Sequence, residues 1–340
     1  MAKDTNLQKI LWYISENWEV AYREMWEYFH DINESTLVRN LDKLIQEGKV
    51  IKNRVWKNTF YWLQGREYIQ NYLDKPFFER PKKGYDFSFL GSYEPNVTSF
   101  LGEKYNILKR EYLDKQTLSS YDYKINIRAI ENLLIDLSFS SSKLEGNTYS
   151  YLDTEILIKY NNSAEWKTQA ETQMILNHKN AIKYILDNRA TITYTKSEFQ
   201  NIHTLLGKWL LLEDYLWKIR SSEVSIGGSA YTPLDNHFQL SEQFDIFLDK
   251  LNAIKNPFEQ SLFILVFIPY FQVFMDINKR TSRIGANIPL IKNGLTPFSF
   301  LQIQDRDYID AILAIYEIHN TSLMRDLFVE NYLLNMKRYI

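Results

Sequence analysis

The chain has 340 residues, 45% of them hydrophobic, so it can bury a sizeable core and is expected to form two domains. It contains no cysteine, which excludes disulfides and thiolate metal sites and favours the reducing cytoplasm. The formal net charge of -2 favours no class of partner. The start lacks the apolar segment of a signal peptide, and the uncharged stretch 260–275 is shorter than the roughly 20 residues of a spanning helix, so no membrane association is expected.

Residues 1–75 contain three helical patterns followed by a two-stranded pattern. Apolar residues recur at helical spacing, and we expect Ser35 to cap the third helix and Gly48 to end it. The expected elements are helices at 7–14, 22–29 and 35–47 and strands at 49–56 and 59–63. This order is typical of a winged helix-turn-helix domain, with the third helix in the recognition position and the hairpin as the wing.

Positive charge in this domain is local. Residues 1–75 contain 7 Lys and 4 Arg against 4 Asp and 7 Glu, so the domain as a whole is not basic. The candidate DNA contacts are Arg39 and Lys43 on the third helix and Lys52, Arg54 and Lys57 in the wing. A solvated edge on a domain that docks another protein or forms a homodimer explains the same residues, so DNA binding and self-association both stay open.

A second domain of different character follows. Residues 76–124 carry prolines, glycines and aromatic residues without a sustained period, and we expect a connector packed on the next domain. Residues 125–340 are expected to be mainly α. The expected helices are 125–140, 163–188, 195–207, 242–253, 257–274, 279–290 and 306–317. Alternating residues and paired glycines in Glu223–Pro233 predict a short β-hairpin.

Polar and charged residues gather where the helix at 279–290 begins: Asp276, Asn278, Lys279, Arg280 and Arg283. Cations at a helix N-terminus oppose the helix dipole, so the cluster indicates a bound anion, which exposed backbone N–H groups would also hold. A polyphosphate is the natural candidate, and Asp276 could hold a magnesium ion that neutralises it. The alternative is that these cations are solvated or paired with surface acids.

Residues 272–283 resemble the active-site motif of the Fic/Doc (Fido) family, H-x-F-x-D/E-G-N-G/K-R-x-x-R, and the resemblance covers most of residues 100–325. It implies an all-α core that transfers AMP from ATP, or acts with another nucleotide, on a hydroxyl group of an unknown target protein. By this resemblance Asp276 would bind Mg²⁺, and Arg283 would hold the terminal phosphate. The residues that would cradle the other phosphates are Asn278, Lys279 and Arg280.

The hairpin resembles the family's flap, which pairs with an extended segment of the target protein as an added strand. The residues implied in this docking are Ser225, Ile226, Gly227, Gly228 and Tyr231.

Residues 141–147 resemble the inhibitory signature S/T-x-x-x-E-G/N of the subclass whose inhibitory helix precedes the core. The residues that carry it are Ser141, Glu145 and Gly146. By resemblance Glu145 would pair with Arg283 and occupy the guanidinium that otherwise grips the terminal phosphate, so ATP would bind unproductively. The alternative is a surface glutamate in the last turn of a helix that Gly146 ends.

Two positions depart from the family pattern. Gln272 stands where the family has its catalytic His, and an amide accepts no proton near neutral pH, whereas general-base catalysis contributes about 10²- to 10⁴-fold. Ile277 replaces a glycine where the backbone approaches phosphate. A slow enzyme, an enzyme of altered chemistry and a nucleotide-sensing, DNA-binding pseudoenzyme remain open. His237 is the nearest candidate for a substitute base, whereas His203 is expected in the core.

Overall fold

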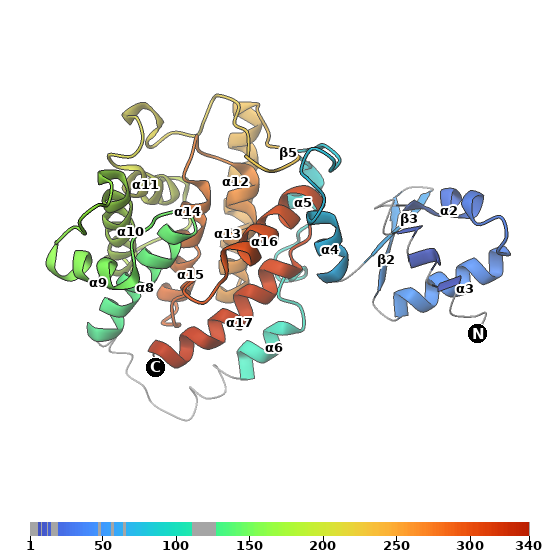
Figure 1. The fold of residues 1–340 in the computed structure, drawn as a ribbon, viewed down its shortest axis with the longest axis horizontal. Coiled ribbons are helices and arrows are strands. Elements are labelled where there is room, and N and C mark those ends of the chain that lie inside the picture. Colours follow the sequence, from blue (N-terminus) through green and yellow to red (C-terminus); the bar gives the residue numbers. More distant parts are fainter. Residues whose placement is uncertain are drawn as a thin grey trace. The chain divides into compact units, whose positions relative to one another are not determined.

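The computed structural model describes residues 6–7, 9–11, 13–14, 20–46, 49–55, 58–63, 66–110 and 127–339. The chain divides into two compact units, Met1–Arg80 and Pro81–Ile340, each with its own set of helices (Figure 1). No helix in these ranges combines the length and hydropathy needed to cross a membrane.

The first unit is a small α+β domain. Its elements are β1 (Val20–Ala21), α2 (Tyr22–Tyr28), α3 (Glu34–Gln46), β2 (Val50–Val55), β3 (Asn58–Leu63) and α4 (Arg66–Leu73), and the described residues between 6 and 14 are also helical. The strands form one antiparallel sheet in the order β1-β3-β2. The expected hairpin is present, with Val55 opposite Asn58 next to the turn.

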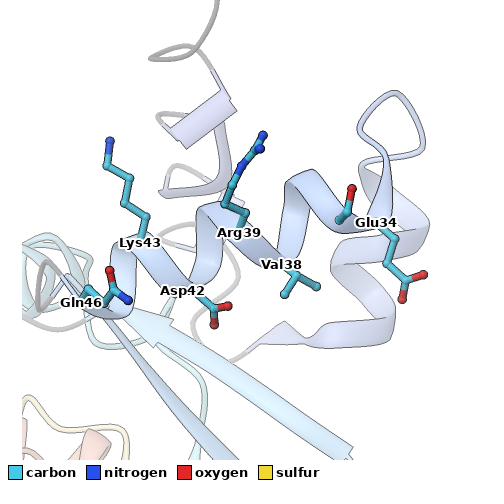
Figure 2. Close-up of a pocket in the computed structure, with 7 residues that line it drawn as sticks. Glu34, Val38, Arg39, Asp42, Lys43 and Gln46 are labelled. Carbon is cyan, nitrogen blue, oxygen red and sulfur yellow. The ribbon is translucent and has the colours of Figure 1, made fainter.

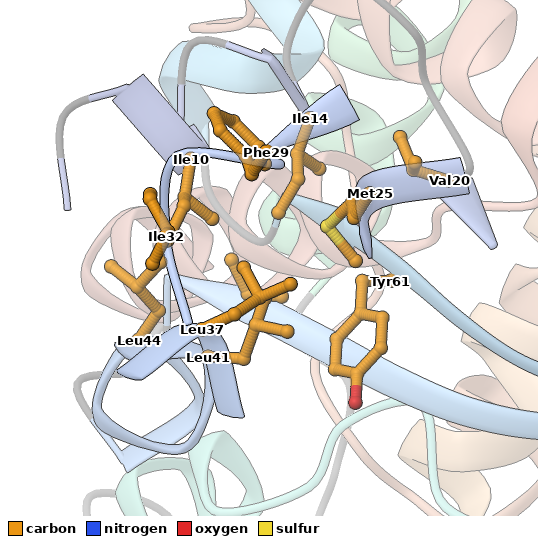
Figure 3. Packing of buried hydrophobic residues seen from close by; sticks show 11 residues of the cluster. Ile10, Ile14, Val20, Met25, Phe29, Ile32, Leu37, Leu41, Leu44 and Tyr61 are labelled. Atoms are coloured by element: carbon orange, nitrogen blue, oxygen red, sulfur yellow. The ribbon is translucent and has the colours of Figure 1, made fainter. Parts of the chain in front are cut away.

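The core of the first unit lies between its helices and the sheet (Figure 3). The fully or nearly fully buried side chains are Ile10, Ile14, Val20, Met25, Phe29, Ile32, Leu37, Leu41, Leu44, Val50 and Tyr61. The helical spacing of Leu37, Leu41 and Leu44 places them on the inner face of α3. The expected cap at Ser35 was wrong, because Asn33 Oδ1 accepts the Thr36 N–H at 2.9 Å and α3 already begins at Glu34.

The second unit is mainly helical, which confirms the expected fold class. Its elements are β4 (Lys83–Gly84), α5 (Phe87–Gly91), α6 (Lys104–Leu108), α8 (Ile127–Lys143), α9 (Tyr151–Tyr160), α10 (Gln169–Asp187), α11 (Lys196–Gly207), the 3-10 turn η2 (Glu213–Tyr215), β5 (Tyr231–Thr232), α12 (His237–Ala253), α13 (Pro257–Phe271), α14 (Asn278–Gly285), α15 (Asn287–Lys292), α16 (Asp305–Ile318) and α17 (Ser322–Tyr339). Of these, β4, α5, α6, α9, η2 and α17 were not expected from the sequence.

Helix α13 is the centre of the second unit and is covered on all sides by α12, α14, α15, α16 and α17 (Figure 1). Asn256 caps it by accepting the N–H groups of the first turn, and Pro257 fits the first helical position, where no N–H is needed. Every residue from Phe258 to Phe271 is buried. A helix that is apolar on all faces therefore delivers its C-terminal end, at Gln272, to the interior of the unit.

Two helix boundaries differ from the expectation near this end. Helix α13 stops at Phe271 instead of 274, because Gln272 has φ 50°, a left-handed conformation that cannot continue a helix. The single helix expected at 279–290 is divided into α14 and α15 at Ala286. The polar cluster therefore lies on a tight loop and a short helix between two buried helices.

The described part of the connector packs on α13 through a buried carboxylate. Glu259 accepts the backbone N–H of Phe100 at 2.6 Å and of Leu101 at 3.2 Å, and it also accepts the hydroxyl groups of Tyr93 and Ser99. Four donors satisfy a carboxylate that is only 4% exposed. These contacts fix residues 93–101 to the first turn of α13.

Candidate functional site

The loop between α13 and α14 is closed by the side chain of Asn278. Its Oδ1 accepts the Phe274 N–H at 2.9 Å, while its Nδ2 donates to Phe274 O at 2.8 Å and to Gln272 Oε1 at 3.1 Å. The Phe274 ring stacks on the His203 ring with a centroid distance of 4.0 Å. Asn278 was expected to hold phosphate, but its amide is engaged in shaping the loop, so only its backbone N–H at the start of α14 remains available for an anion.

Gln272, at the position expected to handle a proton, is held by the interior. Its Nε2 donates to Pro269 O at 2.7 Å and to Tyr316 Oη at 3.1 Å. Its backbone carbonyl accepts Arg220 Nε at 2.5 Å. The side chain thus acts as a hydrogen-bonding link between α13, α16 and the loop, and an amide in this position cannot serve as a general base.

Arg283 of α14 is fully buried and donates four hydrogen bonds. Its Nε donates to Ser141 Oγ at 2.9 Å, its Nη1 to Tyr308 Oη at 3.0 Å, and its Nη2 to Ser141 O at 3.1 Å and Glu145 Oε1 at 2.6 Å. The geometry brings the end of α8 against α14 and α16. All three guanidinium nitrogens of Arg283 therefore have a partner.

The Glu145–Arg283 contact is a charge pair with a second cation nearby, since Lys279 Nζ lies 3.5 Å from Glu145 Oε2. Burial alone would raise the pKa of the Glu145 carboxyl, but the charges of Arg283 and Lys279 hold that pKa below its usual value. Burial opposes the charge on Arg283, yet Tyr308 and Glu145 raise its pKa further. Both groups are consequently ionised at neutral pH, and the pair persists there.

The helix end that carries Glu145 is formed by local backbone contacts. Gly146 has φ 83°, its N–H donates to Lys143 O at 2.8 Å, and the next N–H, from Asn147, donates to Ser142 O at 3.1 Å. A side chain at this left-handed position would be strained, so a glycine ends the helix there. The turn aims Glu145 at Arg283 instead of at solvent.

Arg280 differs from Arg283 because much of its guanidinium is buried without partners. The residue is 7% exposed, and its Nε and Nη1 have no hydrogen-bond partner among the described residues. Its Nη2 lies 3.7 Å from Asp276 Oδ2. Buried guanidinium donors are costly unless an anion accepts from them, so this residue fits a phosphate oxygen.

Asp276, the expected magnesium ligand, is exposed at the outer edge of the loop. Its Oδ1 accepts the Ile277 N–H at 2.5 Å, which leaves Oδ2 directed toward Arg280. The described residues contain no group of three or more His, Cys, Asp or Glu side chains arranged to hold a metal. Magnesium typically takes one or two carboxylates and completes its shell with phosphate oxygens and water, and Asp276 fits that use.

The segment 222–234 has its turn at the expected glycines, where the Ser229 N–H donates to Ile226 O at 3.3 Å. Its second half contains β5, which pairs in parallel with β4, opposite Lys83 and Gly84; residues 223–226 form no strand, so the two arms of the expected hairpin are not paired with each other. Ser225, Gly227 and Gly228 are exposed and Ile226 is half-buried, as target docking would require. Tyr231 corrects the expectation: it is 3% exposed, and its hydroxyl donates to Tyr270 O, so it anchors the segment.

Both ends of this segment are fastened by one buried arginine. Arg220 donates to the carbonyl groups of Ser222, Leu234 and Gln272, and its own N–H donates to Val273 O. The segment and the loop at 272–273 are thus held by the same side chain. This arrangement fixes the position of the segment 222–234 relative to the loop between α13 and α14.

His237, the candidate for a substitute base, is held by a backbone carbonyl at the start of α12. His237 Nδ1 donates to Arg220 O at 2.9 Å, because a carbonyl can only accept, and the residue lies beyond the segment 222–234. His203 is fully buried, as expected, and burial lowers its pKa to about 4. Its role is to stack on Phe274 and support the loop.

The expected DNA contacts lie on the first unit, where α3 lines a shallow pocket (Figure 2). Arg39 and Lys43 face it together with Glu34 and Asp42, so cations and acids alternate along the exposed face of α3. On β2, Lys52 and Arg54 are exposed. Lys57 lies outside the described residues.

Four contributors to the site were not recognised from the sequence: Tyr316, His178, Glu317 and the clamping role of Arg220. Glu317 is fully buried and accepts Ser229 Oγ at 2.8 Å and the Ala230 N–H at 3.0 Å, so it holds the segment 222–234 from α16. The sequence marks Glu317 only as a charged residue among the apolar positions of the helix expected at 306–317. His178 and Tyr316 follow ordinary helical patterns and gave none.

A comparison with known protein families finds a match that includes the loop between α13 and α14. Residues 193–290, from before α11 to within α15, match the model of the Fic/DOC family. No curated protein matches the chain.

Solved structures of similar fold are also known. Fic-1 (residues 134–508) from C. elegans shares 15% sequence identity with a TM-score of 0.56, over 71% of this chain and 70% of that one. A Fic domain containing signaling protein from Bacteroides thetaiotaomicron shares 15% identity with a TM-score of 0.57, over 68% and 94%. A Fic family protein from Desulfovibrio desulfuricans shares 16% identity with a TM-score of 0.52, over 72% and 76%.

The second unit is therefore a helical domain of the Fic fold, with the polar loop described above at the end of its central helix. Residues 193–290 of this chain form a Fic/DOC family domain. The segment with Glu145 and the first unit both lie outside the matched residues.

Proposed function

We propose that the loop and helix at 272–283 bind the polyphosphate of ATP together with Mg²⁺. The observation that carries this proposal is Arg280, a buried cation whose Nε and Nη1 lack partners among the residues described. Lys279 and the backbone N–H groups at the start of α14 add further donors. Asp276 would share Mg²⁺ with phosphate oxygens.

The reaction that this site would support is transfer of AMP to a hydroxyl group of a target protein. The hydroxyl oxygen would bond to the α-phosphorus, the bond to the β-phosphate would break, and pyrophosphate would leave. The hydroxyl proton would go to solvent, because Gln272 is an amide whose Nε2 and Oε1 are already hydrogen-bonded. We infer slow transfer, and binding of nucleotide is the better supported half of the function.

The target would dock on residues 225–228, of which Ser225, Gly227 and Gly228 are exposed. An extended peptide can add to this segment through its backbone groups. Arg220 and Glu317 hold the segment from within, so the docking site would be rigid. This supports a protein substrate over a small molecule.

Glu145 would restrain the nucleotide. Its carboxylate accepts a hydrogen bond from Arg283 Nη2 at 2.6 Å, and the terminal phosphate would otherwise accept from this donor. Binding of ATP in a productive pose would require this contact to break. The site would thus be autoinhibited at rest.

The experiment that tests this function supplies ATP labelled on its α-phosphate, with Mg²⁺, and measures transfer of the label to the protein itself and to proteins of an added extract. The variants are Glu145→Gly, Gln272→His and the two combined. We expect trace labelling by the wild type, more by Glu145→Gly and most by the double variant. Arg280→Met should abolish labelling, while the matched control Arg189→Met, a surface arginine in the same unit, should not. Equal labelling by Arg280→Met, or none by any variant, would refute the proposal.

A DNA-binding role for the first unit is a second proposal with less support. Exposed Lys52 and Arg54 on β2 favour it. Glu34 and Asp42 beside Arg39 and Lys43 oppose it, because acids on α3 would face phosphates or base edges. Protein docking or homodimerisation through the same unit uses such a mixed surface equally well.

A further inference from the structure

The contacts of Arg283 extend beyond the charge pair with Glu145 to a histidine on a third helix. Ser141 Oγ lies 2.9 Å from Arg283 Nε and 2.9 Å from Nε2 of His178 on α10. Helix α10 packs on both α8 and α14 (Figure 1). His178 is fully buried. Nothing in the reaction proposed above uses this ring.

The direction of each hydrogen bond in this chain is fixed by one carbonyl. His178 Nδ1 lies 2.7 Å from Met174 O, which can only accept, so Nδ1 carries the proton; Ser142 Oγ is also near it, at 3.3 Å. Burial lowers the pKa of His178 to about 3, so the ring is neutral at pH 7. Nε2 must then accept, and the Ser141 hydroxyl must donate to it.

This direction determines what Ser141 offers to Arg283. With its proton engaged by His178, the Ser141 oxygen presents its lone pairs to Arg283 Nε. Hydrogen bonds in such a chain polarise one another, which strengthens the last of them. Without His178 the hydroxyl would turn to a carbonyl of its own helix, as serine in a helix commonly does.

Ser141 supplies two of the four acceptors of Arg283, through Oγ and its backbone carbonyl, and Glu145 supplies one. Removing the Glu145 carboxylate therefore leaves Nε and Nη1 engaged. The restraint on Arg283 is divided between a charged contact and a neutral hydrogen-bond chain.

We propose that His178 is a positioning residue of the inhibitory segment: through the Ser141 hydroxyl it holds the Nε edge of Arg283, so α10 takes part in restraining the nucleotide site. This inference rests on the proposed function, because its effect is on the grip of Arg283 on a terminal phosphate. It predicts that nucleotide affinity responds to residues that touch neither the nucleotide nor Glu145.

The test is calorimetric titration of ATP and of ADP, each with Mg²⁺, into the full chain. The variants are Ser141→Ala and His178→Phe, which remove one hydroxyl or the ring nitrogens. The matched control is Ser138→Ala, a buried serine on the same helix whose Oγ has no partner among the described side chains. Ser141→Thr, which keeps the hydroxyl, is the rescue variant.

We expect Ser141→Ala and His178→Phe each to raise ATP affinity about fivefold, the equivalent of one hydrogen bond, with little change for ADP. Ser138→Ala and Ser141→Thr should match the wild type. Thermal unfolding checks that each variant folds. If His178→Phe does not fold, the comparison of Ser141→Ala with Ser138→Ala carries the test.

A failure of this inference can be distinguished from a failure of the proposed function. If Glu145→Gly binds ATP more tightly than the wild type while Ser141→Ala does not, the inference is wrong and the proposed function stands. A loss of ATP affinity in Ser141→Ala would also overturn it. If no variant, Glu145→Gly included, binds either nucleotide, the proposed function itself fails.

Discussion

Replacing Ile277 by alanine and by glycine separates two opposing effects at one residue. Ile277 is 2% exposed, and its Cδ1 lies beside Gly207 at the end of α11, so its side chain contributes burial. Its φ of 66° is left-handed, which costs a residue with a Cβ about 1–2 kcal/mol and a glycine almost nothing.

Both substitutions remove the buried side chain beyond Cβ, but they differ in strain. Ile277→Ala keeps the strain and loses the buried side chain, so it should lower the free energy of unfolding by about 2–5 kcal/mol. Ile277→Gly relieves the left-handed strain, and this gain is partly offset by the loss of the Cβ and by the greater freedom of glycine in the unfolded chain. We expect the glycine variant to be less stable than the wild type and about 1 kcal/mol more stable than the alanine variant.

The assay is urea-induced unfolding followed by circular dichroism, which reports mainly on the helical second unit. Both variants are compared with the wild type under one set of conditions. If Ile277→Ala is as stable as Ile277→Gly or more stable, the loop is not strained at this position. The account of Ile277 as a strained replacement for a glycine would then be refuted.

Three further predictions concern other parts of the molecule. Arg220→Met should lower the free energy of unfolding by about 2–4 kcal/mol and speed amide exchange in residues 222–234, because buried carbonyls lose their donor; unchanged exchange would contradict the clamp. The pKa of His178 in the folded protein, about 3, lies below the ordinary 6.5. The stability that the neutral buried ring contributes is therefore complete above pH 6.5 and is lost on acidification. Unfolding titrations should therefore show stability falling by about 1.4 kcal/mol per pH unit between pH 6.5 and 5, and less steeply in His178→Phe; identical slopes would count against a neutral buried ring. If the first unit binds DNA, its affinity should fall with salt and with the pair Lys52→Ala and Arg54→Ala, and a salt-independent gel shift would exclude phosphate contacts.

The sequence predicted most helices of the second unit because their apolar faces are regular. Helix α9 was missed although a capping box marks its start, with Ser150 and Asp153 bonded reciprocally. Helix α17 was missed because polar residues interrupt its inner face: Asn331 and Asn335 are buried there, and Asn335 donates to Ser299 O. A periodicity argument cannot anticipate polar core residues whose partners lie far away in the sequence.

The candidate site was predictable where its residues are adjacent in the sequence. The charges at 276–283 are adjacent in sequence, and their gathering at a helix start is visible without a fold. The pairing of Glu145 with Arg283, 138 positions apart, was anticipated only by resemblance to a family. The links from Ser141 to His178 and from Gln272 to Tyr316 depend on how helices pack, and no local pattern encodes them.

The engagement of Asn278 with its own loop was unexpected for a similar reason. Asparagine at a helix start often caps the helix or binds a ligand. Here Gln272 and Ile277 both have left-handed backbones, and the Asn278 side chain bonds to Phe274 and Gln272 within the loop. Such a closed loop follows from two unusual backbone conformations. Neither residue type favours that conformation, so the sequence alone argued against it.

The most direct test of the account is calorimetric titration of ATP with Mg²⁺ into Glu145→Gly and into the same variant with Arg280→Met added. The account predicts saturable binding by the first, and binding at least about tenfold weaker when the buried guanidinium is removed. Equal affinities of the two proteins, or no heat of binding from Glu145→Gly, would contradict a phosphate site at 272–283.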